Sequence, residues 1–163
     1  MNEFVRVHTR FICNEDNAGI GRARPGSMCV KEFVWQERVY YDATDAGGIV
    51  YHASYLIMME HARTEWLRAL GLEQETLRRD WQRQFVVAGM QIDFRRPARF
   101  DDLLEVTVVV QGTGAASIDF HQTVRRAGET LVQADVRVAC LHSDTLRPVR
   151  LPSQLRQEIA NGG

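Results

Sequence analysis

Hydrophobic and polar positions alternate in the second half of the chain. Met90, Ile92 and Phe94 are separated by polar side chains, and the same period of two returns in residues 104–110, 118–124 and 132–140. Alternation over such lengths is typical of strands that bury one face. Pro97 and the glycines at 112, 114 and 128 mark the turns between these stretches. The pattern therefore predicts four strands with the spacing of hairpins.

Residues 52–70 follow a different period, and they predict one long helix. Apolar or long side chains recur at a spacing of three or four residues at Leu56, Met59, Arg63, Trp66 and Leu70. Gly71 is a natural stop because glycine favours the position after a helix. A helix of this length extends about 28 Å at 1.5 Å per residue, enough to serve as the central rod of a small domain.

Shorter elements complete the pattern. Residues 32–41 predict a strand that leads into the helix region, whereas 74–83 and 151–160 predict short, exposed helices. Residues 1–30 show no sustained period and contain the mixture NEDNAGIGRARPGS, so we expect a flexible N-terminal extension there. Residues 31–163 form one expected domain.

Hairpin-spaced strands after a single long helix favour an α+β architecture, in which an antiparallel sheet packs on that helix. The composition fits this expectation, with 45% hydrophobic and 25% charged residues. The net charge of −1 gives no overall attraction for nucleic acid or an anionic membrane. We therefore expect no nucleic-acid partner.

Several other classes of site find no support in the sequence. Three cysteines without C-x-x-C spacing suggest neither a disulfide framework nor a metal site, and they fit a cytoplasmic location. No apolar run has the length of a transmembrane segment, and Asn14, Glu15 and Asp16 interrupt any signal-peptide core. Neither a G-x-S-x-G elbow nor a phosphate-binding or dinucleotide glycine pattern occurs. We therefore expect no metal and no cofactor.

The chemistry is concentrated in residues 40–55, YYDATDAGGIVYHASY. Two carboxylates, Asp42 and Asp45, precede the pair Gly47-Gly48, and His52 begins the predicted helix. Glycine allows close approach of the backbone to a ligand, and the amides of a helix start stabilise an oxyanion or a polarised carbonyl. A carboxylate beside such amides has the parts needed for acyl transfer. Asp45 is also a good turn residue, so the residues alone leave its catalytic role open.

Here the sequence resembles a known family. The run D-x-T-D-A-G-G-I-V-Y-H-A-S-Y, followed by M-E-H-A-R-T-E-W-L, is similar to the Tol–Pal-associated acyl-CoA thioesterases of the YbgC type. These belong to the 4-hydroxybenzoyl-CoA thioesterase-like hotdog family. The resemblance covers roughly residues 32–158 and includes F-V-V-A-x-M and R-P-A-R-F-D-D. The chain departs from the family at Ala43, where the family has an aspartate.

The resemblance implies a hotdog fold, in which a curved antiparallel sheet of about five strands wraps around one long helix. It also implies hydrolysis of an acyl thioester to a free acid and coenzyme A, with Asp45 as nucleophile or general base. The backbone amides from Gly48 to His52 would then form the oxyanion hole. The His52 ring is a further candidate for orienting Asp45 or water.

The remaining candidates are substrate-binding residues, namely Tyr51, Tyr55, Glu60, Arg95 and Arg96. The tyrosines are equally suited to packing. Glu60 is either an ion-pair partner of Arg63 or another arginine, or a rival catalytic carboxylate, because some other hotdog thioesterases use a glutamate on the helix. The arginines beside Pro97 would meet the phosphates of coenzyme A or remain solvated.

Two other functions compete with hydrolysis. One is a hotdog hydratase or dehydratase that acts on acyl thioesters. The other is a non-catalytic scaffold that binds acyl carriers and is linked to the cell-envelope Tol–Pal system. The expected partners are acyl-CoA or an acyl-carrier-protein thioester. The chain itself is expected to form a homo-oligomer, a dimer or tetramer of hotdogs, because the sheet would otherwise leave an unpaired edge.

Overall fold

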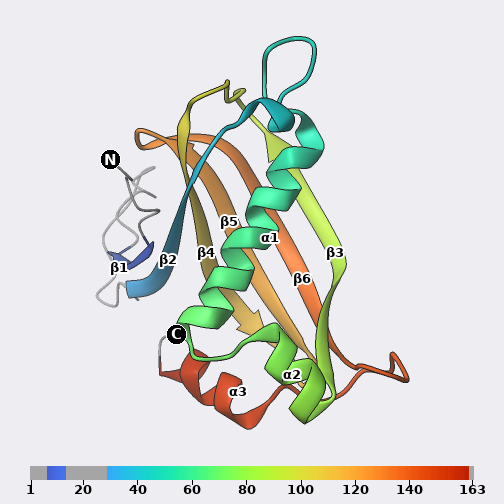
Figure 1. Ribbon diagram of the computed structural model, residues 1–163. Helices are drawn as coiled ribbons and strands as arrows, with labels where there is room; N and C mark the ends of the chain where they lie inside the picture. Colours follow the sequence, from blue (N-terminus) through green and yellow to red (C-terminus); the bar gives the residue numbers. More distant parts are fainter. Residues whose placement is uncertain (1–6, 14–28, 162–163) are drawn as a thin grey trace.

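The computed structural model describes residues 7–13 and 29–161, and these form one sheet with three α-helices (Figure 1). Six antiparallel strands follow the order β1-β2-β4-β5-β6-β3. The strands are β1 Val7–Cys13, β2 Cys29–Arg38, β3 Arg83–Phe94, β4 Leu103–Thr113, β5 Ser117–Arg126 and β6 Glu129–His142. The helices are α1 His52–Ala69, α2 Gln74–Trp81, α3 Ser153–Ala160 and the short 3₁₀ helix η1 Tyr41–Ala43.

The predicted α+β architecture is confirmed, with six strands in place of about five. Figure 1 shows the sheet curving around α1, whose axis runs along the strands. The helix packs against β2, β4 and β5, while β6 extends the same apolar surface with Val132, Val136 and Val138. None of the helices in the described part of the chain is long and apolar enough to cross a membrane.

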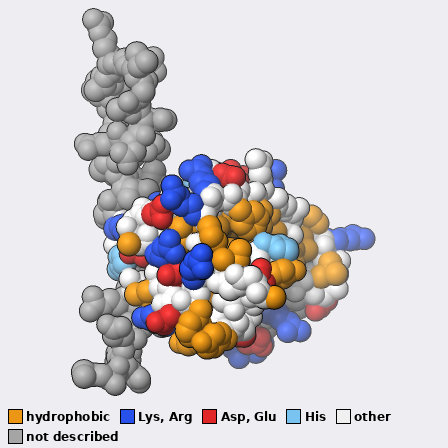
Figure 2. Space-filling view, turned by 90° about the horizontal axis from the view of Figure 1, so that it is seen from above, with side chains coloured by type: hydrophobic (Ala, Val, Ile, Leu, Met, Phe, Trp, Pro, Cys, Tyr) orange, Lys and Arg blue, Asp and Glu red, His pale blue; other side chains and the backbone are white. Residues whose placement is uncertain are grey.

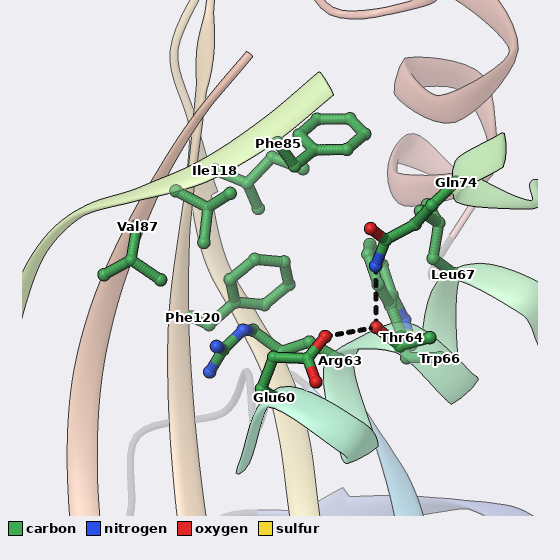
Figure 3. A pocket seen from close by; sticks show the side chains of 11 residues that line it. Glu60, Arg63, Thr64, Trp66, Leu67, Gln74, Phe85, Val87, Ile118 and Phe120 are labelled. Atoms are coloured by element: carbon green, nitrogen blue, oxygen red, sulfur yellow. Dashed lines mark hydrogen bonds between the residues drawn. The ribbon is translucent and has the colours of Figure 1, made fainter. Parts of the chain in front are cut away.

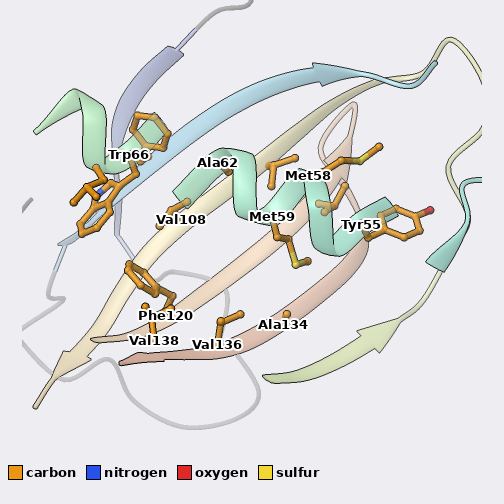
Figure 4. Packing of buried hydrophobic residues seen from close by; sticks show 14 of the residues in the cluster. Tyr55, Met58, Met59, Ala62, Trp66, Val108, Phe120, Ala134, Val136 and Val138 are labelled. Carbon is orange, nitrogen blue, oxygen red and sulfur yellow. The ribbon is translucent and has the colours of Figure 1, made fainter. Parts of the chain in front are cut away.

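The face of α1 that packs on the sheet agrees with the predicted period only in part. Its buried residues are Tyr55, Met58, Met59, Ala62, Trp66 and Leu67, which include Met59 and Trp66 of that period. They lie against Val108 and Phe120, and the Trp66 ring meets the Phe120 ring edge-on at 5.2 Å (Figure 4). Leu56, another position of the period, is 37% exposed, and Ile57 is 55% exposed. The early part of the helix is apolar on both sides, so periodicity alone did not identify its inner face.

Strand β1 lies within the segment that was expected to be a flexible extension. It pairs with β2 along its whole length, with Arg10 opposite Glu32. The Glu32 side chain is fully buried, and its Oε2 accepts a hydrogen bond from Arg10 Nε at 2.6 Å. Arg125 Nη1 donates to the same oxygen at 3.3 Å, and Arg125 Nη2 lies 3.1 Å from Oε1. The buried carboxylate is thus paired with one cation from β1 and one from β5. Residues 1–6 and 14–28 lie outside the described residues.

Candidate active site

The segment between η1 and α1 folds into a tight turn that holds the Asp45 carboxylate. The Gly48 amide donates to the Asp45 carbonyl at 3.0 Å, and the Asp45 amide donates to the Ile49 carbonyl at 2.9 Å. The Gly47 amide donates to Asp45 Oδ1 at 2.8 Å. Gly48 has φ +73°, a backbone conformation that glycine adopts without strain. The exposed carboxylate is therefore fixed by its own turn at the surface.

Two backbone hydrogen bonds anchor this turn to neighbouring segments. The Val50 amide donates to the Ala98 carbonyl at 2.9 Å, and the Tyr51 amide donates to the Ala43 carbonyl at 2.9 Å. Figure 1 shows the turn at the end of the molecule where α1 begins. The R-P-A-R-F-D-D segment, far away in the sequence, is thus brought beside the T-D-A-G-G segment.

The hydrogen bonds of the turn leave few amides for an oxyanion. Gly48, Val50 and Tyr51 already donate to carbonyl groups, and the Ser54 amide donates to the Tyr51 carbonyl at 2.8 Å. The amides of His52 and Ala53 form the first turn of α1, and within the described residues neither makes a hydrogen bond. Of the predicted range from Gly48 to His52, the amides of Ile49 and His52 make no hydrogen bond within the described residues, and only His52 also lies at the positive end of a helix.

Ala43, where the related family has an aspartate, contributes through its backbone and its methyl group. Its carbonyl accepts the Tyr51 amide, and its side chain is partly buried against the core. Thr44 closes the same 3₁₀ turn, with its hydroxyl donating to the Tyr41 carbonyl at 2.8 Å. A carboxylate is not needed at position 43 to hold this turn.

The two candidate tyrosines differ in their surroundings. Tyr51 is exposed, and its ring lies 4.3 Å from the ring of His52, which is also exposed. Tyr55 is buried, and its hydroxyl oxygen accepts the Ala98 amide at 2.8 Å. Burial raises the pKa of Tyr55, partly opposed by this hydrogen bond, so the phenol remains protonated. Tyr55 therefore clamps α1 to the segment that anchors the Asp45 turn.

Arg95 and Arg96 follow β3 at the same end of the molecule. Both are exposed, Arg95 pairing with Asp93 at 3.0 Å and Arg96 with Glu129 at 3.0 Å. Exposed pairs of this kind contribute little stability, so a phosphate could replace either carboxylate at small cost. Figure 2 views this end, where hydrophobic side chains gather with arginines around them.

Glu60 is not ion-paired with Arg63, which corrects one sequence-based alternative. Glu60 Oε1 accepts the Thr64 hydroxyl at 2.6 Å, and the same hydroxyl accepts Gln74 Nε2 at 2.6 Å (Figure 3). Arg63 Nη1 instead donates to Gln122 Oε1 at 2.6 Å. Burial lowers the pKa of Arg63, and the nearby Glu60 charge partly restores it.

These residues border a cavity of about 100 Å³ between α1, the start of β3 and the inner face of β5 and β6. Figure 3 shows its apolar wall, with Phe85, Val87, Ile118 and Phe120 facing the helix. Glu60, Arg63, Thr64 and Gln74 supply the polar groups. This cavity could not be predicted from the sequence, because Gln122 and Arg63 are 59 positions apart in the chain and nothing in either segment indicates that they meet.

A thiol nucleophile and a metal centre are two further kinds of chemistry that side chains could provide. Burial raises the pKa of the Cys140 thiol, which disfavours a thiolate nucleophile there. Among the described residues, no group of three His, Cys, Asp or Glu side chains is arranged to hold a metal ion.

The chain matches known thioesterases in sequence. Residues 47–133 match the family model described as the thioesterase superfamily. The chain is 44% identical over 124 residues to the acyl-CoA thioesterase YbgC of Haemophilus influenzae, and this alignment covers 76% of the chain and 91% of that protein.

Solved structures agree with these matches. A probable thioesterase from Bartonella henselae has a TM-score of 0.71 and 35% sequence identity, covering 73% of this chain and 98% of that one. A 1,4-dihydroxy-2-naphthoyl-CoA thioesterase from Synechocystis has a TM-score of 0.74 over 80% of this chain and 96% of that one. Its identity of 23% supports the fold alone.

Proposed function

The chain belongs to the thioesterase superfamily, as a hotdog enzyme of the YbgC type, and from this premise we propose that it hydrolyses acyl-CoA thioesters to free acid and coenzyme A. The observation that carries the proposal is the turn from Asp45 to Gly48. This turn fixes an exposed carboxylate seven positions before His52, where α1 begins with unpaired amides.

The thioester carbonyl would bind at the start of α1. Its oxygen accepts hydrogen bonds from the amides of His52 and Ala53, which stabilise the negative charge that develops during attack. Loss of a single oxyanion donor typically costs about 3–4 kcal/mol of activation free energy, so these two amides are a major catalytic element. Gly48 shapes the turn, and its own amide stays bonded to Asp45.

Asp45 would deliver the attack in one of two ways. As a nucleophile, its carboxylate adds to the carbonyl carbon, the C–S bond breaks, and water then hydrolyses the mixed anhydride and regenerates Asp45. As a general base, it removes a proton from a water that attacks the same carbon. In both cases the thiol leaves readily, because a thiol pKa of about 8.5 makes the thiolate a good leaving group.

Coenzyme A would extend from this point across the surface that carries Arg95 and Arg96. Both arginines are exposed and paired only with exposed carboxylates, so their cations are available to phosphates. Tyr51 lies exposed beside His52 and borders the same surface. These residues would bind the carrier and leave the reaction itself to Asp45 and the helix amides.

The proposal includes a dimer as the basic unit. β3 is an edge strand of 12 residues, and it exposes Val86, Val87 and Phe94. Such an edge presents unpaired amide and carbonyl groups to other chains. Pairing with β3 of a second copy would cover it, and a partner subunit would then border each site.

A thiol-release assay across acyl-CoA chain lengths and aromatic acyl groups tests the proposed activity. Release of free coenzyme A together with the free acid is the expected result. Hydration of an enoyl-CoA without thiol release would instead identify a hydratase, and tight binding without turnover of any thioester would identify a scaffold. Repeated turnover in water labelled with heavy oxygen separates the two roles of Asp45, because only the nucleophilic route can place the label in its side chain.

A further inference from the structure

The cavity beside Arg63 lies on the same face of α1 as the proposed reaction centre. His52, Leu56, Glu60 and Arg63 recur every three or four residues, so they share one face of α1. Leu56 and Glu60 on this face are exposed. Arg63 lies roughly 16 Å from His52 along the helix axis, at 1.5 Å per residue. An extended chain, but not a single ring, would span this distance.

Strand β3 borders this helix face with apolar side chains. Phe94 meets the Tyr55 ring at 6.0 Å near the start of the helix, and Phe85 and Val87 line the cavity at the far end. Between them, Met90 and Ile92 are partly buried against the core. This row of β3 side chains offers an apolar surface along the length of an acyl chain, beside the helix face.

The polar groups of the cavity are unusual because they include a partly buried cation with spare donors. Gln122 is fully buried, and its Nε2 donates to the Met59 carbonyl at 3.1 Å and the Thr107 carbonyl at 3.3 Å. Its amide oxygen is thereby turned towards Arg63 Nη1 and holds the guanidinium in place. No carboxylate of the described residues pairs with Arg63, and the bond to Gln122 uses only one of its five N–H groups.

Glu60 supplies the opposite polarity at the same cavity. One of its oxygens accepts the Thr64 hydroxyl, which leaves acceptor capacity on the carboxylate. A donor-only cation and an acceptor-only anion that line one small cavity suit a neutral group that both accepts and donates. A hydroxyl has this property, whereas a methyl would leave the cation unsatisfied and a second carboxylate would face repulsion from Glu60.

We propose that this cavity binds the far end of an extended acyl chain and selects a terminal hydroxyl, which accepts from Arg63 and donates to Glu60. This proposal rests on the thioesterase function proposed above, and it names the substrate class as ω-hydroxyacyl thioesters. Gln122 is a positioning residue that orients Arg63, and Gln74 positions Glu60 through Thr64.

Matched substrates test the selection in the full-length protein. Thiol release is measured for ω-hydroxyacyl-CoA, unsubstituted acyl-CoA and ω-carboxyacyl-CoA of equal chain length, over a series of medium chains. At the chain length that reaches the cavity, kcat/KM should be roughly tenfold higher for the substrate that ends in a hydroxyl than for the one that ends in a methyl group. A tenfold ratio corresponds to the free energy of about one hydrogen bond to a charged group. In short chains the two should be equal.

Variants then assign the preference to the cavity. Arg63→Met keeps an unbranched apolar stem but removes the guanidinium, so it should abolish the preference, whereas Glu60→Gln should reduce it several-fold. Arg68→Met is the matched control, because Arg68 is an exposed arginine of the same helix outside the cavity and pairs with Glu65. The control should keep the full preference.

The possible outcomes separate the two proposals. Absence of thiol release from every substrate would overturn the thioesterase function itself. Equal rates for hydroxyl and methyl ends at every chain length, with hydrolysis intact, would overturn the cavity proposal alone. A preference for the ω-carboxylate that grows in Glu60→Gln would also overturn it. If Arg63→Met does not fold, the wild-type comparison and Glu60→Gln still decide.

Discussion

Replacing Gly47 with alanine should damage catalysis without damaging the fold. A Cβ at position 47 would lie 3.1 Å from Asp45 Oδ1 and 4.0 Å from Asp45 Cγ, so the carboxylate has to move by a few tenths of an ångström. Gly47 has no positive φ, and its amide would remain to donate to Asp45. The substitution thus displaces the reacting group and leaves the backbone in place.

The expected loss follows from the geometry of attack. A misplacement of about 1 Å can lower a rate roughly 10²-fold, so Gly47→Ala should reduce kcat/KM about tenfold to a hundredfold. Stability should be unchanged or higher by about 0.4–1 kcal/mol, because alanine restricts the unfolded chain. Thiol-release kinetics and thermal unfolding measured on the same preparation test both expectations.

Gly48→Ala is the matched control, and it should show the opposite pattern. A Cβ at position 48 meets no atom within 4 Å, but φ is +73°. The strain should therefore cost about 1–2 kcal/mol of stability, with kcat/KM largely kept at temperatures where the variant is folded. Full activity of Gly47→Ala, or a greater loss of kcat/KM in Gly48→Ala, would refute the placement of Asp45 by this turn.

Three further predictions concern the framework around the site. Tyr55→Phe removes the acceptor of the Ala98 amide, so denaturant unfolding should show a free energy of unfolding that is lower by about 1–3 kcal/mol. An unchanged unfolding midpoint would mean that water replaces the hydroxyl. Arg10→Met, or deletion of residues 1–28, should lower the free energy of unfolding by roughly 1–3 kcal/mol, because Glu32 loses a cation. Unchanged stability in both variants would show that β1 is dispensable. Light scattering should give a dimer or a multiple of it, and a fully active monomer at micromolar concentration would contradict pairing through β3.

The helix and the strands could be predicted because their periods are regular. The bounds of α1, His52–Ala69, agree closely with the predicted 52–70, since the stop at Gly71 is a local signal. The inner face of this helix could not be predicted, because Leu56 and Ile57 are as apolar as the buried methionines. Exposure of these two depends on where the sheet ends, which is a property of the whole fold.

Strand β1 was missed for a similar reason. Its sequence, VHTRFIC, lies in a segment without repeated periodicity, and it is stabilised by partners on β2 that are 16 to 28 positions away. The pairing of Arg10 with a buried glutamate gave no signal in the sequence, since Glu32 was predicted only as a strand residue.

The candidate site was predictable in part. Asp45, the glycine pair and the helix start are neighbours in the chain, so their proximity follows from the sequence. The role of the Gly48 amide in closing the turn, and of Tyr55 in holding Ala98, depends on hydrogen bonds that only the folded chain defines. The Arg63–Gln122 contact is likewise a product of packing between α1 and β5.

The comparison of two carboxylates tests the central claim most directly. Asp45→Asn keeps the shape and an acceptor for the Gly47 amide but removes the charge, so kcat for unsubstituted acyl-CoA should fall about 10²–10⁴-fold. Glu60→Gln should change the same kcat less than tenfold, because Glu60 lies roughly 12 Å along the helix axis from His52. Both variants must retain the wild-type circular dichroism and elution volume. The reverse ranking would place the chemistry on the helix and contradict the assignment of Asp45.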